Sequence, residues 1–457
     1  MTRLSESHNH KRSVSSIFML FPRREIKSPI LLGMTIATLM ALIILGGAPN
    51  VPGWQSSVMM VFSAALIASA FYFGSFAEFS KLGLLQKTFL FSLILVPLIQ
   101  VIPLPPSIWQ SFPGRSLENE IFQLVGAADQ WHSISLNPAE TLFVLATLTP
   151  AAAIFLAILK LNIVERRVVA SVVILLALVS VIIGLFQFST GGETFNFYNS
   201  SHKQFLLGFF ANRNHQGLYI ASALALTISL TFRLSENRTI ALTFSGLVTF
   251  FFIGAAIATT SRAGLSFAIL AAFLTVLINM WSNDKSGRIV AILAVSAIVF
   301  FLLFQSIGAV FGDVLERYST IGDDSRWDIW VQSGTIIQNY FPWGSGLGTF
   351  VPVYQQSEPL EFIQPTFVNH VHNDYYELIL ETGIGGIAIL ALFVATLGQA
   401  VAKSQLSKLS GTKAAAFVIV LMVALHSIVD YPLRTQAMAA VFAFCLAVIF
   451  RPKSKKT

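Results

Sequence analysis

The chain has 457 residues, of which 55% are hydrophobic and 11% are charged, and its formal net charge is +7. Soluble domains carry about 25% charged residues, so this chain cannot cover a water-facing surface and is expected to lie in a membrane. Its single cysteine, Cys445, excludes an intramolecular disulfide framework and a thiolate metal cluster. These properties predict an all-α, polytopic membrane protein.

Apolar runs of about 17–25 residues are long enough to cross a bilayer as helices. Twelve such runs follow one another along the chain, so we predict about 12 transmembrane helices. The predicted spans are Pro29–Ala48, Ser56–Gly74, Gln86–Leu104, Glu140–Leu159, Val168–Phe188, His215–Arg233, Thr239–Thr259, Gly264–Trp281, Arg288–Gly308, Gly383–Val401, Lys413–Asp430 and Gln436–Phe450.

The basic residues indicate which side each loop faces, because Lys and Arg accumulate in cytoplasmic loops. With a cytoplasmic N-terminus, 22 of the 29 basic residues fall on the inner side and seven on the outer side. Six of those seven are arginines, and six of the eight histidines also lie outside. We therefore expect the tails at 1–28 and 451–457 to be cytoplasmic. The net charge then reflects topology, and we expect no binding to nucleic acid.

Three long segments between the predicted spans face outward, at 105–139, 189–214 and 309–382. Loops of such length inside a compact protein are usually functional. The largest segment separates a block of nine spans, 29–308, from the last three spans, 383–450. We expect it to contain short helices and a site of chemistry.

The end of this largest segment, from His370 onward, is a polar run that leads directly into an apolar helix. If the run is helical, its spacing places one histidine and three acids on one face: His370, Asp374, Glu377 and Glu381. A neutral histidine can act as a base near neutral pH, and neighbouring acids can orient it. Two alternatives stay open: a hydrogen-bonded helix end without chemistry, and a zinc site, although His-x-His is not the HExxH pattern.

Three outer arginines are candidate anion ligands, because the guanidinium fork matches phosphate and carboxylate groups. Arg262 lies in a short turn between two predicted spans, where snorkelling to lipid headgroups is the alternative. Arg213 lies among polar residues at a predicted helix N-terminus, where backbone amides also favour anions. Arg326 lies between Asp324 and Asp328, so a local salt bridge is its alternative.

Two further motifs on the outer side have weaker implications. The glycines of Pro342–Phe350 either let backbone amides approach a ligand or form a tight turn, and the loop matches no nucleotide-binding sequence. His426 and Asp430 are four residues apart at a predicted helix end and so share a face. A structural hydrogen bond between them is the favoured interpretation, and orientation of a substrate group by Asp430 is the alternative.

These motifs resemble those of the O-antigen ligase and polymerase superfamily of bacterial inner-membrane proteins. The ligase pattern is a histidine, then Asn, Ser or Gln, then nine residues and Gly-x-x-Gly, and it is matched by His372, Asn373, Gly383 and Gly386. The glycine loop, the Arg326-x3-Trp330 pair and the turn around Arg262 also look like parts of that family. One long outer loop before the last three helices is the family layout.

The resemblance implies a glycosyltransferase without metal or cofactor, with its active site on the periplasmic face of the inner membrane. Its donor would be an undecaprenyl-diphosphate-linked oligosaccharide. Its acceptor glycan would be lipid A core for a ligase or a lipid-linked repeat for a polymerase, and both stay open. His372 would be the base for the acceptor hydroxyl, and Arg262 and Arg326 would hold the diphosphate. Arg213 is a further diphosphate candidate, and the supporting candidates are His370, Asn373, Glu377, Glu381 and Asp430.

Two other classes of function stay open. A transporter of polysaccharide or lipid suits twelve helices, but transporters carry ionisable or helix-breaking positions near mid-membrane. Here the polar residues gather at one face instead. A sensor with an outer ligand-binding loop is the third hypothesis, and the short inner loops weaken it.

Overall fold

The structure is a computed structural model that describes residues 26–281 and 325–451, except positions 199, 201, 236, 361, 362, 364–366, 405–408 and 410. Within these ranges the chain is mostly helical, and its only sheet is an antiparallel pair of short strands, β1 (Pro103–Leu104) and β2 (His132–Ser133). The predicted helical class is therefore confirmed. The predicted span Arg288–Gly308 and the first part of the large loop, 309–324, lie outside the described residues.

Among the described residues, seven helical runs are long and apolar enough to cross a membrane. They are α3 (Gly53–Tyr72), α8 (Pro138–Ala146) joined to α9 (Thr149–Lys160), α10 (Ile163–Ser189), α11 (Arg213–Leu234), α12 (Arg238–Ala258), α13 (Arg262–Trp281) and α18 (Ile384–Ser404). Four shorter apolar helices are α2 (Pro29–Leu45), α5 (Leu84–Gln100), α19 (Thr412–His426) and α20 (Gln436–Phe450). Each of these coincides with a predicted span, which supports a multi-pass membrane protein.

Local sequence explains where the helices depart from the predicted spans. The predicted span Glu140–Leu159 is two helices, because Pro150 lacks the backbone N–H that would donate to the carbonyl of Ala146, the last residue of α8. Helix α2 ends before Gly46 and Gly47, since a Cβ on Gly47 would lie 1.8 Å from the Phe209 carbonyl oxygen. Helix α19 ends at His426, so Asp430 lies in a turn beyond the helix and not on its last turn.

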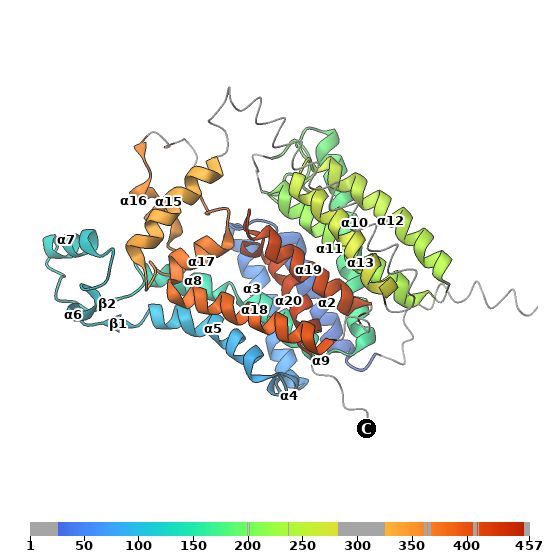
Figure 1. Cartoon of the computed structure of the whole chain (residues 1–457), viewed down its shortest axis with the longest axis horizontal. Coiled ribbons are helices and arrows are strands. Elements are labelled where there is room, and N and C mark those ends of the chain that lie inside the picture. The colour runs from blue at the N-terminus through green and yellow to red at the C-terminus, as the bar shows by residue number, and fades with distance from the viewer. Residues whose placement is uncertain are drawn as a thin grey trace, which may run out of the picture.

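The apolar helices pack into one bundle, in which α11 lies beside α10, α13 and α19 (Figure 1). Helix α11 is buried along most of its length and packs against α10, α12, α13 and α19. Its closest neighbour is α13, because Gly217 faces Gly264 and a Cβ on Gly217 would lie 2.5 Å from the Gly264 Cα. This contact sets the first residues of α11 and α13 side by side.

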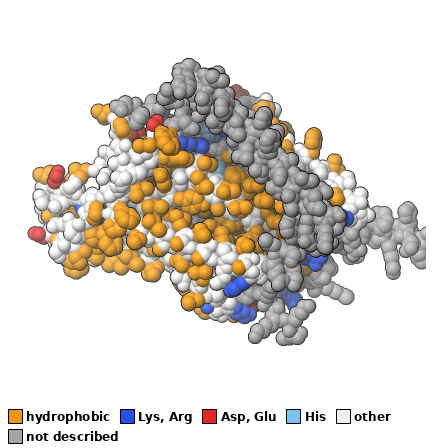
Figure 2. Space-filling model, viewed as in Figure 1, with side chains coloured by type: hydrophobic (Ala, Val, Ile, Leu, Met, Phe, Trp, Pro, Cys, Tyr) orange, Lys and Arg blue, Asp and Glu red, His pale blue; other side chains and the backbone are white. Residues whose placement is uncertain are grey.

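The visible face over α5 and α18 is covered by hydrophobic side chains (Figure 2). Phe91, Leu95 and Val394 are each more than half exposed there. A contiguous apolar surface of this kind on a helical bundle suits contact with lipid.

Helices α15 (Ser325–Tyr340), α16 (Phe350–Ser357) and α17 (Asp374–Thr382) form a cap at one end of the bundle (Figure 1). A second apolar cluster, which includes Ile336, Phe350 and Leu380, holds these three helices together. The remaining short elements are α4 (Ser75–Ser80), α6 (Pro106–Trp109), α7 (Ser116–Leu124) and the 3-10 helix η4 (Pro432–Arg434) between α19 and α20.

The glycine loop at 342–350 is a packing turn beneath the cap. Gly344, Gly346 and Gly348 have φ values of 76°, 112° and 85°, which side chains rarely adopt. A Cβ on Gly344 would lie 2.4 Å from the Glu381 carbonyl oxygen, and one on Gly346 would lie 2.2 Å from Ser135 Oγ. These contacts favour the tight-turn interpretation of the glycines over a ligand-binding one.

Part of the predicted outer segment 189–214 folds back into the bundle. Leu206, Leu207 and Phe210 are buried, and the side chain of Gln187 holds the backbone there. Its Oε1 accepts hydrogen bonds from Leu207 N at 3.2 Å and Gly208 N at 2.7 Å, and its Nε2 donates to the Gly208 carbonyl at 3.0 Å. The inserted segment leads directly into the first turn of α11 and so fixes its position.

Candidate functional site

A buried carboxylate, Asp430, lies at the centre of a polar cluster at the cap end of the bundle. Its Oδ1 is 3.5 Å from His372 Nδ1 and 3.6 Å from His215 Nε2, and its Oδ2 is 3.7 Å from His426 Nε2. Asn214 Nδ2 donates a hydrogen bond to Oδ2 at 2.8 Å. A carboxylate without solvent needs donors and positive charge around it, so this arrangement stabilises its ionised form.

His372 is the most exposed histidine of this cluster. Its side chain is 23% exposed, whereas those of His215 and His426 are fully buried. Its φ of 55° lies in the left-handed region, where a residue other than glycine is strained by about 1–3 kcal/mol. Such strain persists only where the surroundings enforce it, and it concentrates at functional sites.

The next residues hold His372 in this conformation. Asn373 is the N-cap of α17, and its Oδ1 accepts hydrogen bonds from Tyr375 N and Tyr376 N. Asp374 N donates to the Ser427 carbonyl at 2.9 Å, and Ser427 Oγ donates back to Asp374 Oδ2 at 2.8 Å. Asn373 therefore shapes the helix start, and α17 is tied to the turn that carries Asp430.

The ring of Tyr431 packs against three histidines. Its centroid is 4.4 Å from that of His370, 4.9 Å from that of His372 and 5.2 Å from that of His215. Burial, together with the nearby Asp430 carboxylate, raises the pKa of the Tyr431 hydroxyl. Tyr431 was not among the residues predicted from the sequence, and its position next to Asp430 was the available signal.

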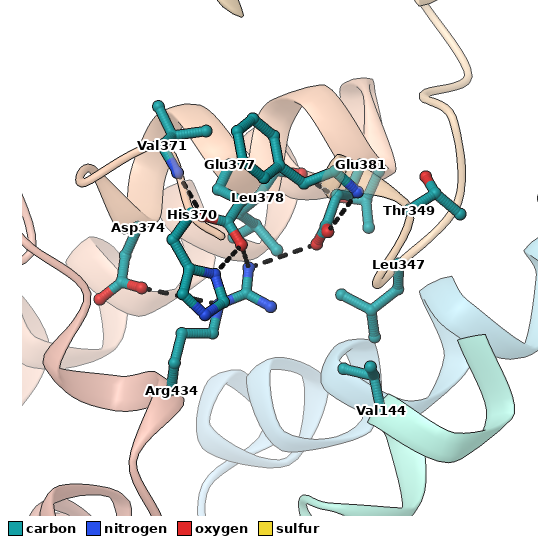
Figure 3. Close-up of polar contacts among 12 residues, drawn as sticks. Val144, Leu347, Thr349, His370, Val371, Asp374, Glu377, Leu378, Glu381 and Arg434 are labelled. Atoms are coloured by element: carbon teal, nitrogen blue, oxygen red, sulfur yellow. Dashed lines mark hydrogen bonds and ion pairs between the residues drawn. The ribbon is translucent and has the colours of Figure 1, made fainter. Parts of the chain in front are cut away.

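A second charged cluster surrounds Arg434, the last residue of η4 (Figure 3). Arg434 Nη2 lies 3.1 Å from Glu377 Oε1 and 3.2 Å from Glu381 Oε2, and its Nε lies 3.8 Å from Asp374 Oδ1. His370 Nδ1 lies 2.8 Å from Glu377 Oε1. One guanidinium thus lies within 4 Å of three carboxyl groups of α17.

Burial and Arg434 set the pKa values of these three carboxyls. For Glu377, burial raises the pKa, but Arg434 and His370 outweigh it and hold the pKa at about 2. For Glu381, burial dominates over Arg434 and raises the pKa to about 7. For Asp374, burial likewise raises the pKa to about 6, against the opposing effect of Arg434.

The three candidate arginines lie near one another at the cap end of the bundle. Arg213 begins α11 and Arg262 begins α13, and Arg326 lies at the start of the described part of α15. Arg213 interacts electrostatically with both of the others. Arg213 Nη1 donates to Thr260 Oγ1 at 2.8 Å, and Arg326 Nη1 donates to the Val429 carbonyl at 3.2 Å. Neighbouring guanidiniums and helix N-termini repel one another unless an anion lies between them, so the arrangement suits an anionic ligand.

The structure changes several sequence-based interpretations. His370 precedes α17, so the predicted helical face starts at Asp374, although His370 still reaches Glu377. His426 Nε2 is too far from Asp430 for the predicted hydrogen bond. Arg326 forms no ion pair with Asp328 in the described part of the chain, and Asp324 lies outside it.

In the parts of the chain that the structure describes, no group of three or more His, Cys, Asp or Glu side chains could hold a metal ion.

A further histidine, His202, belongs to the same region but was not among the residues predicted from the sequence. It interacts with Arg213, Asp430 and His372, and burial together with Arg213 lowers its pKa.

A family model described as O-antigen ligase matches residues 247–391. The match contains Arg262, Arg326 and His372, whereas Arg213 and Asp430 lie outside it. It confirms the resemblance to the O-antigen ligase superfamily over this part of the chain. No curated protein matches the sequence.

Proposed function

We propose that the protein is a glycosyltransferase that moves an undecaprenyl-diphosphate-linked glycan to the hydroxyl of an acceptor sugar. The observation that carries the proposal is the pairing of the partly exposed His372 with the buried Asp430, 3.5 Å apart, beside three neighbouring arginines. The O-antigen ligase match supports this class of activity. The acceptor distinguishes a ligase from a polymerase, and both fit this site.

In the proposed reaction, His372 takes the proton of the acceptor hydroxyl as that oxygen attacks the anomeric carbon of the donor. The bond from the anomeric carbon to the diphosphate oxygen breaks, and its electron pair leaves with undecaprenyl diphosphate. Asp430 stabilises the imidazolium that forms on His372. Arg213, Arg262 and Arg326 stabilise the charge that develops on the leaving diphosphate, which therefore needs no proton.

We further propose twelve spans, with both termini in the cytoplasm and the cap on the periplasmic face of the bacterial inner membrane. The proposal is supported by the excess of Lys and Arg in the alternate loops. It is also supported by the position of all the candidate site residues at the cap end of the bundle. A lipid-linked donor and a polar acceptor glycan meet at such a membrane surface.

The test is glycan transfer by purified protein with a defined undecaprenyl-diphosphate oligosaccharide, in the presence of EDTA. We expect transfer by the wild type and by His132→Ala, whose histidine stacks on Phe122 away from the site, and its loss in His372→Ala. Extension of the donor alone would identify a polymerase, and transfer only to added lipid A core would identify a ligase. An intact rate in His372→Ala would refute the site assignment. The absence of transfer to any acceptor would favour the transporter.

A further inference from the structure

One side-chain amide, that of Asn214, joins the two halves of the site. Ser261, next to Arg262, donates a hydrogen bond from Oγ to Asn214 Oδ1 at 2.7 Å. Asn214 Nδ2 in turn donates to Asp430 Oδ2 at 2.8 Å. The chain of hydrogen bonds continues on the arginine side, where Gly264 N donates to Ser261 Oγ at 2.9 Å.

The orientation of this amide is dictated by its partners. The ionised carboxylate of Asp430 can only accept hydrogen bonds, so the amide nitrogen must face it and the amide oxygen must face Ser261. The backbone of Asn214 is fixed as well, because its N–H donates to Asn212 Oδ1 at 2.8 Å. A single asparagine thus links α11, the turn before α13 and the turn after α19.

We propose that Asn214 is a positioning residue, which couples the arginine turn that binds the donor diphosphate to the Asp430–His372 pair that acts on the acceptor. This inference rests on the proposed function. Asn214 touches neither substrate in the proposed reaction. It acts through Asp430. Its hydrogen bond holds that carboxylate in place, so that the carboxylate stays beside the partly exposed His372.

Substitution by aspartate separates this role from simple packing. Asn214→Asp keeps the size of the side chain and the acceptor for Ser261, but it replaces the donor to Asp430 with a second carboxylate. Two carboxyl groups at hydrogen-bond distance do not both ionise readily, so the pair holds one shared proton and loses it only at higher pH. Repulsion between the two carboxylates then displaces Asp430 from His372. The groups that interact with Asp430 or His372 from the neighbouring elements are His202, His215, His426 and Tyr431. Arg213, Arg326 and His370 interact in turn with His202, His426 and Tyr431.

The experiment measures the pH dependence of kcat/KM for transfer by the wild type, Asn214→Asp and Ser261→Ala. For Asn214→Asp we expect nearly wild-type kcat/KM while the carboxyl pair keeps its shared proton, because the protonated group still donates to Asp430. We expect about a tenfold loss once that proton is gone, which adds an alkaline limb that the wild type lacks. For Ser261→Ala we expect a higher KM for the donor and an unmoved pH profile. Asn237→Asp is the matched control, because Asn237 caps α12 and its side chain accepts hydrogen bonds from Thr239 N and Ile240 N.

The ring signals of His372, followed by NMR of ring-labelled histidine over the same pH range, test the same coupling without transfer. We expect the His372 signals of Asn214→Asp to depart from those of the wild type where the carboxyl pair loses its proton, and those of Asn237→Asp to match the wild type. If the wild type transfers glycan but neither the pH profile nor the His372 signals change in Asn214→Asp, the inference is overturned and the proposed function stands. If the signals change but the wild type transfers nothing, the coupling holds and the proposed function fails.

Discussion

The charge of Arg434 is expected to be essential for the stability of the cap. Arg434→Met leaves the carboxylates of Glu377 and Glu381, each 1% exposed, without the guanidinium that lies 3.1 and 3.2 Å away. Removal of one partner of a buried ion pair costs about 3–5 kcal/mol, because the remaining charge stays buried and unpaired. We therefore expect the free energy of unfolding to fall by about 3–5 kcal/mol at pH 8.

The loss should depend on pH in a defined direction. In the wild type, the pKa of Glu377 is depressed to about 2. The ionised carboxylate therefore stabilises the folded protein at pH values above the ordinary pKa of a glutamate, and this stability is lost as the pH falls towards 2. The raised pKa of Glu381, about 7, contributes stability at low pH that is lost as the pH rises through 7. Without Arg434 both carboxyls hold their protons more tightly, so the deficit of Arg434→Met should shrink at pH 5.

The assay is unfolding by denaturing detergent in mixed micelles at pH 5 and pH 8, for the wild type and three variants. Arg434→Lys keeps the charge but loses the fork, so its loss should be smaller than that of Arg434→Met. The triple variant that adds Glu377→Gln and Glu381→Gln removes the unpaired charges and should recover most of the stability. Wild-type stability of Arg434→Met at pH 8, or no recovery in the triple variant, would refute the reasoning.

Three further predictions concern the site and the glycine loop. His372→Gln should lower kcat by about 10²–10⁴-fold with little change in donor binding; an unchanged kcat in transfer assays would contradict its role as base. Arg262→Ala and Arg326→Ala should each weaken binding of the donor, and inhibition by inorganic pyrophosphate should weaken in parallel; equal inhibition of variants and wild type would contradict a diphosphate site. Gly344→Ala should destabilise the protein by about 1–3 kcal/mol, since its φ is 76°. Gly334→Ala is the matched control, because a Cβ at this position in α15 would meet no atom within 4 Å. It should be neutral or stabilise the protein by up to about 1 kcal/mol in the same unfolding assay.

The helices were largely predictable from the sequence, because a membrane requires long apolar runs. The span Gln436–Phe450 matches α20 residue for residue, and the other described spans differ from their helices mainly at the ends. Helix ends were less predictable, since they depend on tertiary contacts such as the approach of Gly47 to Phe209. The insertion of residues 206–210 into the bundle was not predicted, because the partner that holds it, Gln187, is a polar residue at the end of an apolar run.

The candidate residues were predictable by type and by their position near the ends of apolar runs, but their partners were not. Arginines, histidines and acids at such positions indicate chemistry whatever the order in which the helices pack. The sequence placed Glu377 and Glu381 on one face with His370, whereas the fold pairs both acids with Arg434 and pairs Asp430 with His372.

By itself the sequence determined a helical membrane protein with candidate arginines and histidines near the ends of its apolar runs, because hydrophobicity and charge act on each segment separately. Only the tertiary structure decided that Asn214, Ser261, His372 and Asp430 meet, since they lie on four different elements. Hydrogen bonds and ion pairs act over a few ångströms, so which of them form depends on how the helices pack. The Gly217–Gly264 contact and the ties between α17 and the turn after α19 supply that packing.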